Sequence, residues 1–228
     1  MALTFTPRTG VSIVHGPNLD DTVRLLRLLE MSADLDLEIM VAVRGGAADE
    51  PALVDRMQGR GSIATVPPGA SDAEAHNAIM TGLVNRGCEF AWILRPELLV
   101  EPLTLGQLVR HMRKVPDCGV VGARIMQFGV PESLIWSDGA AVSVDGSIKR
   151  HSAGLSRSRA PKGKSVDVEA VCRAGALYRV AALEAVGLFV DGDEVEGHDV
   201  HWSDRARRAG WRVMVQRRAR PTLEGVDG

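Results

Sequence analysis

The most informative segment of the chain runs from Glu194 to Val213 and has the sequence EVEGHDVHWSDRARRAGWRV. It places one isolated acid, Asp199, where a turn leads into a helix, and the helix that follows is basic and amphipathic. Gly210 then ends the helix and a strand follows. The segment therefore predicts a turn, a helix and a strand, with a carboxyl group at the start of the helix.

Upstream of this segment, strands and helices alternate. The expected strands are residues 11–14, 37–43, 62–66, 90–94 and 119–125, and the expected helices between them are 19–30, 51–57, 72–86 and 102–114. Ser71 and Glu74 have the spacing of a capping box at the start of the third helix. This alternation predicts an α/β fold with a mostly parallel, doubly wound sheet, whose ligand site lies outside the carboxyl ends of the strands.

The second half of the chain has a different pattern. Two short strands flank Asp145 and Gly146, which is a two-residue hairpin signal. Residues 150–164 then form a loop rich in Ser and Gly, long enough to indicate mobility or a functional lid. We expect one domain over residues 1–228, with a change of pattern between about 9–125 and about 126–228.

Composition narrows the class of protein. The hydrophobic fraction of 45% and the charged fraction of 25% are those of a soluble globular chain. A net charge of -2 argues against general nucleic-acid binding, which needs a strongly basic domain. The cations are nevertheless clustered at 149–164 and 205–220, either as solvated faces or as contacts for phosphate or an anionic membrane.

Cysteine usage and hydropathy predict a cytoplasmic location, with peripheral membrane contact left open. Cys88, Cys118 and Cys172 are odd in number and widely spaced, which favours small buried residues over disulfides or a zinc site. No apolar run approaches the length of a membrane span, and the first residues lack the apolar core of a signal peptide.

Several segments, in order, resemble family 2 glycosyltransferases, in particular the rhamnosyltransferase-like branch. Residues 11–18, from the first strand to Asn18, are similar to the family's opening strand and the residues that follow it. Gly69 to Gly82 is similar to a Gly-rich segment leading into a helix with a central Asn, here Asn77. The segment 90–102 is similar to the strand that ends in the family's metal motif. The segments 171–189 and 194–213 are similar to the acceptor-side and catalytic segments. The resemblance covers nearly the whole chain and implies a nucleotide-binding half at about 9–125 and an acceptor-side half at about 126–228.

The resemblance implies a GT-A fold and inverting transfer of a sugar from a nucleotide-diphosphate donor to a glycan, lipid-linked or secondary-metabolite acceptor. A peripheral membrane or protein partner is also expected, because the acceptor-docking helices of longer relatives are missing. A divalent metal, Mg or Mn, normally stabilises the leaving diphosphate in that chemistry. The implied roles are catalytic for Asp199, nucleotide-sugar-binding for Asn18, Asp49, Asn77 and Arg95, acceptor-binding for Gly175 and Trp202, and metal-binding for Glu97 and His198.

Each of these residues also has an ordinary structural interpretation. Asp199 would serve as an acid at a helix start, Asn18 as an N-cap, and Trp202 as a core residue. His198 and His201 are three apart and would chelate a transition metal if both lie on one helical face. Arg95 would neutralise a diphosphate directly or remain a surface residue.

The chain departs from the family pattern at four places. Arg44-Gly45-Gly46 replaces the acidic nucleobase segment, and Arg95-Pro96-Glu97 replaces the metal motif. Gly197-His198-Asp199 replaces the Glu-Asp pair, and Leu223 lies where the family has a late His. The second hypothesis is therefore a catalytically degenerate GT-A domain that binds or scaffolds an active transferase. A dinucleotide-dependent oxidoreductase is disfavoured because residues 15–18 lack the Gly-x-Gly-x-x-Gly pattern.

Overall fold

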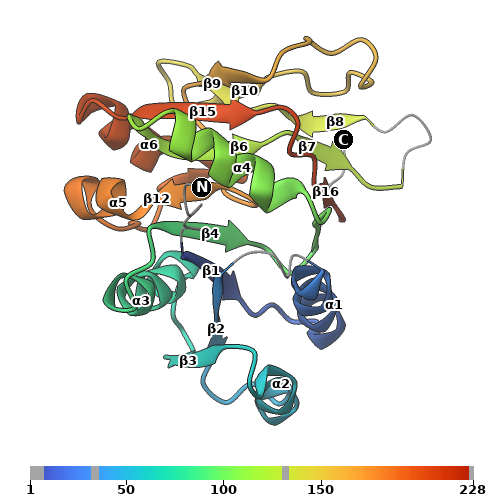
Figure 1. Ribbon diagram of the computed structural model, residues 1–228, viewed down its shortest axis with the longest axis vertical. Helices are drawn as coiled ribbons and strands as arrows, with labels where there is room; N and C mark the ends of the chain where they lie inside the picture. Colours follow the sequence, from blue (N-terminus) through green and yellow to red (C-terminus); the bar gives the residue numbers. More distant parts are fainter. Residues whose placement is uncertain (1–7, 32–35, 130–133, 226–228) are drawn as a thin grey trace, which may run out of the picture.

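The computed structural model describes residues 8–31, 36–129 and 134–225, and a large mixed sheet runs through its centre (Figure 1). The strands of this sheet are β1 (Thr9–Val14), β2 (Leu37–Arg44), β3 (Ser62–Val66), β4 (Phe90–Leu94), β6 (Cys118–Ala123), β11 (Ser165–Asp167), β12 (Leu177–Arg179) and β15 (Arg212–Gln216). Their order across the sheet is β11-β15-β6-β12-β4-β1-β2-β3.

Most neighbouring strands of this sheet run parallel. The strands β4, β1, β2 and β3 are parallel to one another, and β15 is parallel to β6. β12 is antiparallel to both of its neighbours, β4 and β6, and β11 is antiparallel to β15. Strands β1, β4 and β6 are buried at every position, as expected for the middle of a sheet covered on both faces. The predicted mostly parallel α/β sheet is confirmed.

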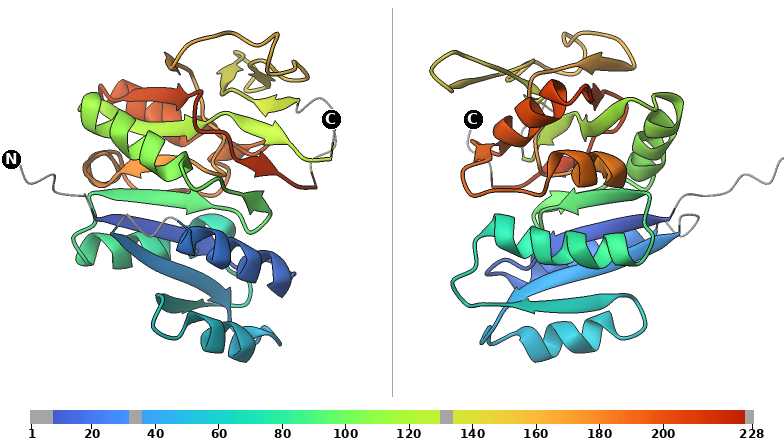
Figure 2. Two further views of the ribbon diagram at one scale, coloured as in Figure 1. Left: turned by 45° about the vertical axis from the view of Figure 1, so that its right-hand side comes forward. Right: turned by 90° about the vertical axis from the view of Figure 1, so that its left-hand side faces the viewer.

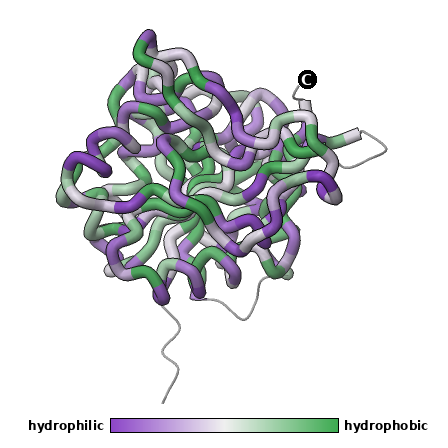
Figure 3. The backbone as a smooth tube through the Cα atoms, turned by 90° about the horizontal axis from the view of Figure 1, so that it is seen from above, coloured by the Kyte–Doolittle hydropathy of each residue, from purple (hydrophilic) through white to green (hydrophobic). Residues whose placement is uncertain are grey.

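Helices cover both faces of the sheet, which gives three layers (Figure 2). One face carries α1 (Leu19–Glu30), α2 (Glu50–Met57) and α4 (Thr104–Lys114), and the other carries α3 (Asp72–Asn85), α5 (Val180–Val186) and α6 (Val200–Arg208). Trp92 and Ile93, consecutive in β4, point into the two opposite cores because side chains alternate along a strand. The apolar strands converge at the centre of the molecule, with hydrophilic turns outside them (Figure 3).

The capping box predicted at the start of α3 is present. The Ser71 hydroxyl accepts a hydrogen bond from the Glu74 backbone N–H at 3.1 Å, and the Ser71 N–H donates to the Glu74 carboxylate at 2.8 Å. The reciprocal bonds satisfy donors that a helix start otherwise leaves free. They fix where α3 begins, and with it the residues of its first turns.

Short strands form three further sheets. A four-stranded sheet has the order β5 (Leu98–Leu99), β16 (Thr222–Leu223), β7 (Ile125–Gln127), β8 (Ile135–Ser137), and two hairpins pair β9 (Ala140–Val142) with β10 (Ile148–Arg150) and β13 (Glu194–Val195) with β14 (His198–Asp199). The strand expected at 119–125 is split at Arg124, whose backbone N–H donates to Ala219 and whose side chain is buried against Asp138. The chain therefore passes from one sheet to the other there.

The hairpin predicted around Asp145 and Gly146 forms, but its loop spans residues 143–147 instead of two residues. The Asp145 carboxylate accepts hydrogen bonds from the N–H (3.0 Å) and hydroxyl (2.7 Å) of Ser147, which holds a wider turn. The three cysteines are buried and unpaired. Among the described residues, no helix combines the length and apolar character needed to cross a membrane.

Candidate active site

A polar cleft lies at the carboxyl ends of β1, β2 and β4, where a doubly wound sheet is expected to bind its ligand. Its volume is about 190 Å³, and it is lined by Val14, His15, Gly16, Pro17, Arg44, Asp72, His76, Ile93, Leu94, Arg95, Pro96, Glu97, Arg173, Ala174 and Glu194. An outer hollow continues from it over Ala47, Ala48 and Asp49 and shares His15 and Arg44 with it. Together they form one track across the end of the sheet.

His15 fixes the junction between the cleft and the outer hollow. Its Nδ1 lies 2.8 Å from the Thr22 hydroxyl in α1, and its Nε2 lies 2.9 Å from the Asp49 carboxylate that precedes α2. The hydrogen bond from His15 holds the pKa of Asp49 below its usual value. The ring therefore joins β1, α1 and α2, and Asp49, predicted to bind the nucleotide sugar, does line the outer hollow.

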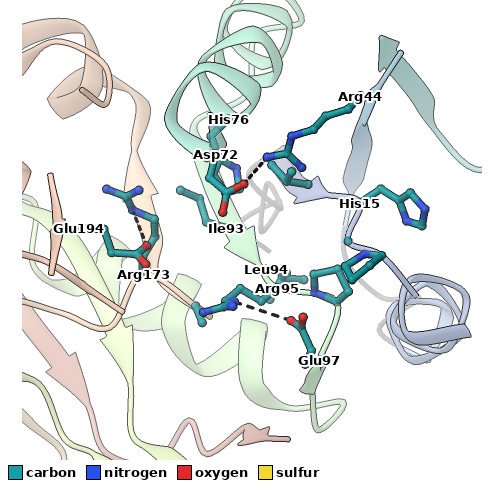
Figure 4. A pocket seen from close by; sticks show the side chains of 15 residues that line it. His15, Arg44, Asp72, His76, Ile93, Leu94, Arg95, Glu97, Arg173 and Glu194 are labelled. Atoms are coloured by element: carbon teal, nitrogen blue, oxygen red, sulfur yellow. Dashed lines mark hydrogen bonds and ion pairs between the residues drawn. The ribbon is translucent and has the colours of Figure 1, made fainter. Parts of the chain in front are cut away.

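Three arginines face the cleft from three different elements, and Figure 4 shows each of them beside a carboxylate. Arg44, at the end of β2, donates to the Ala70 carbonyl at 2.8 Å and to Asp72 at 2.5 Å. Arg95, after β4, lies 3.7 Å from Glu97. Arg173 is the third. Guanidinium groups bind phosphate and carboxylate oxygens in pairs, so an anionic ligand here would share these arginines with the carboxylates beside them.

Asp199, the predicted catalytic residue, does not line the cleft. It is fully buried, and its two oxygens accept hydrogen bonds from Arg173 at 2.6 Å and from the Tyr178 hydroxyl at 2.5 Å. Burial raises the pKa of this carboxyl, while Arg173 and Tyr178 oppose that rise. Both carboxylate oxygens are thus occupied by partners inside the protein, and Arg173 lies between the carboxylate and the cleft.

Glu194 is the carboxylate that reaches the cleft from the same region. It lies opposite Asp199 in the β13–β14 ladder, its side chain is 36% exposed, and Arg173 Nε lies 3.5 Å from it. Partial burial raises the pKa of Glu194, with Arg173 and Arg95 acting in the opposite direction. Arg173 thus connects a buried carboxylate to one that faces the ligand space.

Asn18 and Asn77, predicted to bind the nucleotide sugar, both have structural partners and lie outside the cleft lining. The Asn18 side chain caps α1 by accepting from the Asp20 N–H at 3.1 Å. The Asn77 amide donates to the Phe189 carbonyl at 2.8 Å and accepts from the Phe189 N–H at 3.0 Å. Arg95, the fourth residue of that predicted set, does line the cleft.

Gly175 and Trp202, predicted on the acceptor side, are buried. The Gly175 carbonyl accepts a hydrogen bond from the Trp92 indole at 3.1 Å, and its φ of +80° favours glycine. The Trp202 indole donates to the Gly187 carbonyl at 2.9 Å. A fully buried ring has no open face for a sugar, so Trp202 acts in the core in this structure.

Another tryptophan, Trp136, lines a hollow that adjoins the cleft. A hollow of about 250 Å³ is lined by Arg95, Trp136, Arg150, Cys172, Ala174, Glu196, Gly197 and Leu223, and it shares Arg95 and Ala174 with the cleft. The Arg150 guanidinium lies over the Trp136 ring at 4.9 Å. Trp136 is 9% exposed and its ring is also stacked on the His198 ring at 5.3 Å, so protein side chains lie against its faces.

The donor set does not fit a metal ion held by the protein alone. Glu97 Oε2 is buried without a hydrogen-bond partner, but its nearest charged neighbour is the cation Arg95. His198, the second predicted ligand, uses both ring nitrogens, towards Ser137 at 2.6 Å and the Glu196 carbonyl at 3.0 Å, and burial lowers its pKa to about 4. No group of three His, Cys, Asp or Glu side chains is placed to share a cation among the described residues.

The sequence did not single out several residues of the cleft: His15, Arg44, Asp72, His76, Arg173 and Glu194. His15, Arg44 and Arg95 follow or end parallel strands, and this topological position is the signal that identifies them. Asp72 and His76 belong to the first turns of α3. Arg173 and Glu194 are 21 positions apart and meet only through the fold.

The arrangement defines a class: this is the GT-A fold of glycosyltransferases, with a charged cleft at the ligand-binding edge of the sheet. Among solved structures, the chain is similar to GalNAc-T7 crystallised with UDP, GalNAc and Mn²⁺, with a TM-score of 0.71 and 13% identity over 96% of this chain. It spans 44% of the length of that chain. No protein-family model and no curated protein matches the sequence. The predicted GT-A fold is confirmed, whereas membership of family 2 stays a prediction.

Proposed function

We propose that this chain transfers a sugar from a nucleotide-diphosphate donor to a hydroxyl group of an acceptor, by an inverting mechanism. The observation that carries the proposal is the convergence of Arg44, Arg95 and Arg173 with the carboxylate Glu194 in one cleft of a GT-A fold. The similar structure contains UDP and GalNAc, which supports a nucleotide sugar as the donor class. The acceptor is a glycan, a lipid-linked sugar or a secondary metabolite.

The two connected hollows suit the two parts of such a donor. The outer hollow, with Asp49 at its side, is the larger, at about 620 Å³, and would take the nucleoside. The diphosphate would lie between Arg44, Arg95 and Arg173, whose forked N–H groups match its oxygens. The hollow beside Trp136 would take the acceptor, since it joins the cleft at Arg95.

Glu194 is the residue we propose as the general base. A base must reach the acceptor hydroxyl, and of the two nearby carboxylates Glu194 faces the cleft while Asp199 is buried behind Arg173. The acceptor oxygen forms its bond to the anomeric carbon as the bond to the diphosphate oxygen breaks. Its proton passes to Glu194, and the diphosphate leaves with the electron pair. Asp199 would position Arg173.

The three arginines would stabilise the negative charge of the leaving diphosphate. Preorganised cations placed where charge develops stabilise a transition state without further reorganisation. Glu97 Oε2 accepts no hydrogen bond, but the Arg95 guanidinium lies 3.7 Å from it, so we assign no step to a metal ion. The test below still compares nucleotide binding with and without Mn²⁺ or Mg²⁺.

The test is calorimetric titration and thermal unfolding with UDP, GDP and dTDP, each with and without Mn²⁺ or Mg²⁺. A nucleotide present at 100 times its Kd should stabilise the fold by about 2.7 kcal/mol. Arg95→Gln should weaken that binding, and Glu194→Gln should abolish transfer while leaving binding in place. Glu184→Gln, an exposed acid of α5 outside the cleft, is the matched control. Failure of every nucleotide to bind would refute the proposal.

A catalytically degenerate domain that binds an active transferase is the second candidate. It is favoured by the occupation of Asp199 by Arg173 and Tyr178, which leaves the family's catalytic position without a free carboxylate. Turnover by the purified chain alone would remove this candidate. Nucleotide binding without transfer or hydrolysis, in the presence of varied acceptors, would support it over the enzyme.

A further inference from the structure

A second basic site lies at the same edge of the sheet as the cleft, beyond the ends of β6 and β15. We name it the basic hollow; its volume is about 220 Å³, and its lining is Arg124, Arg157, Ala160, Pro161, Lys162, Gly163, Arg217, Arg218 and Arg220. It shares this edge because β4, β6 and β15 all run in one direction. None of its lining residues lines the cleft.

Backbone and side-chain hydrogen bonds hold the walls of the basic hollow together. The loop from residue 151 to 164 contains no helix or strand, yet the Lys164 carbonyl accepts from the Arg217 N–H at 2.9 Å. The Arg124 guanidinium donates to the Pro161 carbonyl at 3.1 Å. The antiparallel pairing of β11 with β15 begins directly after the loop. The positive groups are therefore brought together by a defined structure.

One buried carboxylate, Asp138, neutralises only part of the positive charge of the hollow. Asp138 is fully buried and accepts from Arg124 at 2.7 and 3.1 Å and from Arg217 at 2.8 Å. Two cations thus share one anion. Within residues 8–31, 36–129 and 134–225, no carboxylate lines the hollow and no ion pair engages the remaining lining cations, which are Arg157, Lys162, Arg218 and Arg220.

The crowding has an electrostatic cost that an anion would relieve. Burial lowers the pKa of Arg220, and the neighbouring cations Arg157 and Arg124 lower it further. An anion in the hollow would oppose that effect. The crowding is local, because the chain as a whole has 27 basic and 29 acidic residues. A second hollow, about 430 Å³ in volume, adjoins at Arg218 and adds Arg110, Lys114 and Lys164.

We propose that the basic hollow binds the phosphate group of an anionic ligand, at a site separate from the nucleotide cleft. Forked guanidinium groups and a lysine around a small recess match the tetrahedral oxygens of a phosphate monoester or diphosphate. The same chemistry is found on a free phosphorylated metabolite and on a lipid headgroup. The inference does not depend on sugar transfer, because it uses none of the residues of the cleft.

The test is calorimetric titration of the full chain with inorganic pyrophosphate. The hollow variant is Arg157→Gln with Lys162→Gln, two exposed side chains of the loop, so the fold is not at risk. The control is Arg27→Gln with Arg56→Gln, which removes the same charge from exposed positions of α1 and α2. We expect the hollow variant to bind pyrophosphate about tenfold or more weakly at one class of site. The control should keep it.

Two further measurements separate the possible sources of signal. Arg95→Gln weakens the cleft and should leave the hollow's binding unchanged, so a failure of the proposed function and a failure of this inference are distinguishable. Sedimentation with phosphatidylcholine vesicles, with and without phosphatidylglycerol, then tests a lipid headgroup. Loss of either pyrophosphate or anionic-vesicle binding in the hollow variant alone supports the inference and identifies the source. Equal binding by the hollow variant and its control, to both probes, overturns it.

Discussion

Asp199→Ala should be among the most destabilising substitutions in this chain. It would leave the Arg173 guanidinium, only 5% exposed, without its buried carboxylate partner, and the Tyr178 hydroxyl without an acceptor. Breaking a buried ion pair on one side costs about 3–5 kcal/mol. A buried hydroxyl left unbonded adds about 1–3 kcal/mol. Because whole domains are stable by about 5–15 kcal/mol, the variant should be close to unfolding at room temperature.

Urea denaturation followed by circular dichroism measures this loss. The matched variant replaces both charged partners by apolar residues of similar size, Asp199→Leu with Arg173→Met. It should recover much of the stability, since removing both partners of a buried pair is often nearly neutral. The coupling between the two positions, measured in a double-mutant cycle of Asp199→Leu, Arg173→Met and the double variant, should therefore amount to several kcal/mol.

A small loss of stability in Asp199→Ala would contradict the buried ion pair. If Asp199→Ala costs less than about 1 kcal/mol, the range of an exposed ion pair, the carboxylate is not held in a buried pair with Arg173. If such a stable variant had also lost sugar transfer, Asp199 would be the base and Glu194 would not. The choice between the two carboxylates therefore needs both the stability measurement and the transfer assay.

Three further substitutions probe other parts of the structure. His198 has a pKa lowered from 6.5 to about 4, so the unfolded chain takes up the proton first. The free energy of unfolding should therefore fall as the pH drops from 6.5 towards 4, and this ring alone should account for about 2 kcal/mol of the loss between pH 7 and pH 5. Urea titrations at the two pH values measure that loss, and His198→Gln should remove the part that this ring contributes. Asn77→Ala should lower the free energy of unfolding by about 1–3 kcal/mol, because it removes two hydrogen bonds to Phe189, and nucleotide affinity should not change. Weaker nucleotide binding would instead support the predicted role of Asn77 in binding the nucleotide sugar. Ser71→Ala should lower the melting temperature through a loss of about 1 kcal/mol at the cap of α3, and an unchanged value would contradict the capping box.

Local patterns in the sequence predicted the elements whose signals are local. The strand at 62–66, the strand at 90–94 and the helix at 19–30 lie where hydrophobic periodicity and their flanking residues placed them. Ser71 and Glu74 predicted the start of α3 because the capping box is set by a spacing of three. Two-residue strands such as β13 and β14 have no periodicity to detect.

The candidate site was harder to predict because its contacts join distant positions. Arg95 was expected near phosphate, and it lines the cleft because it follows a central parallel strand. The partner of Asp199 could not be inferred, since Arg173 lies 26 positions away on the other side of α5. His15 showed no partner pattern in the sequence, yet it contacts both Thr22 and Asp49. Strand order, which no local pattern encodes, determines these contacts.

The position of β12 has a consequence for how the chain assembles. β12 is three residues long and is inserted between β4 and β6, and its own sequence lies more than 50 positions beyond the end of β6. Until it arrives, β4 and β6 each present an unpaired, apolar edge open to other chains. Closing such a distant contact is slow. A fragment ending near residue 125 should therefore aggregate, and the two halves should have to be synthesised as one piece.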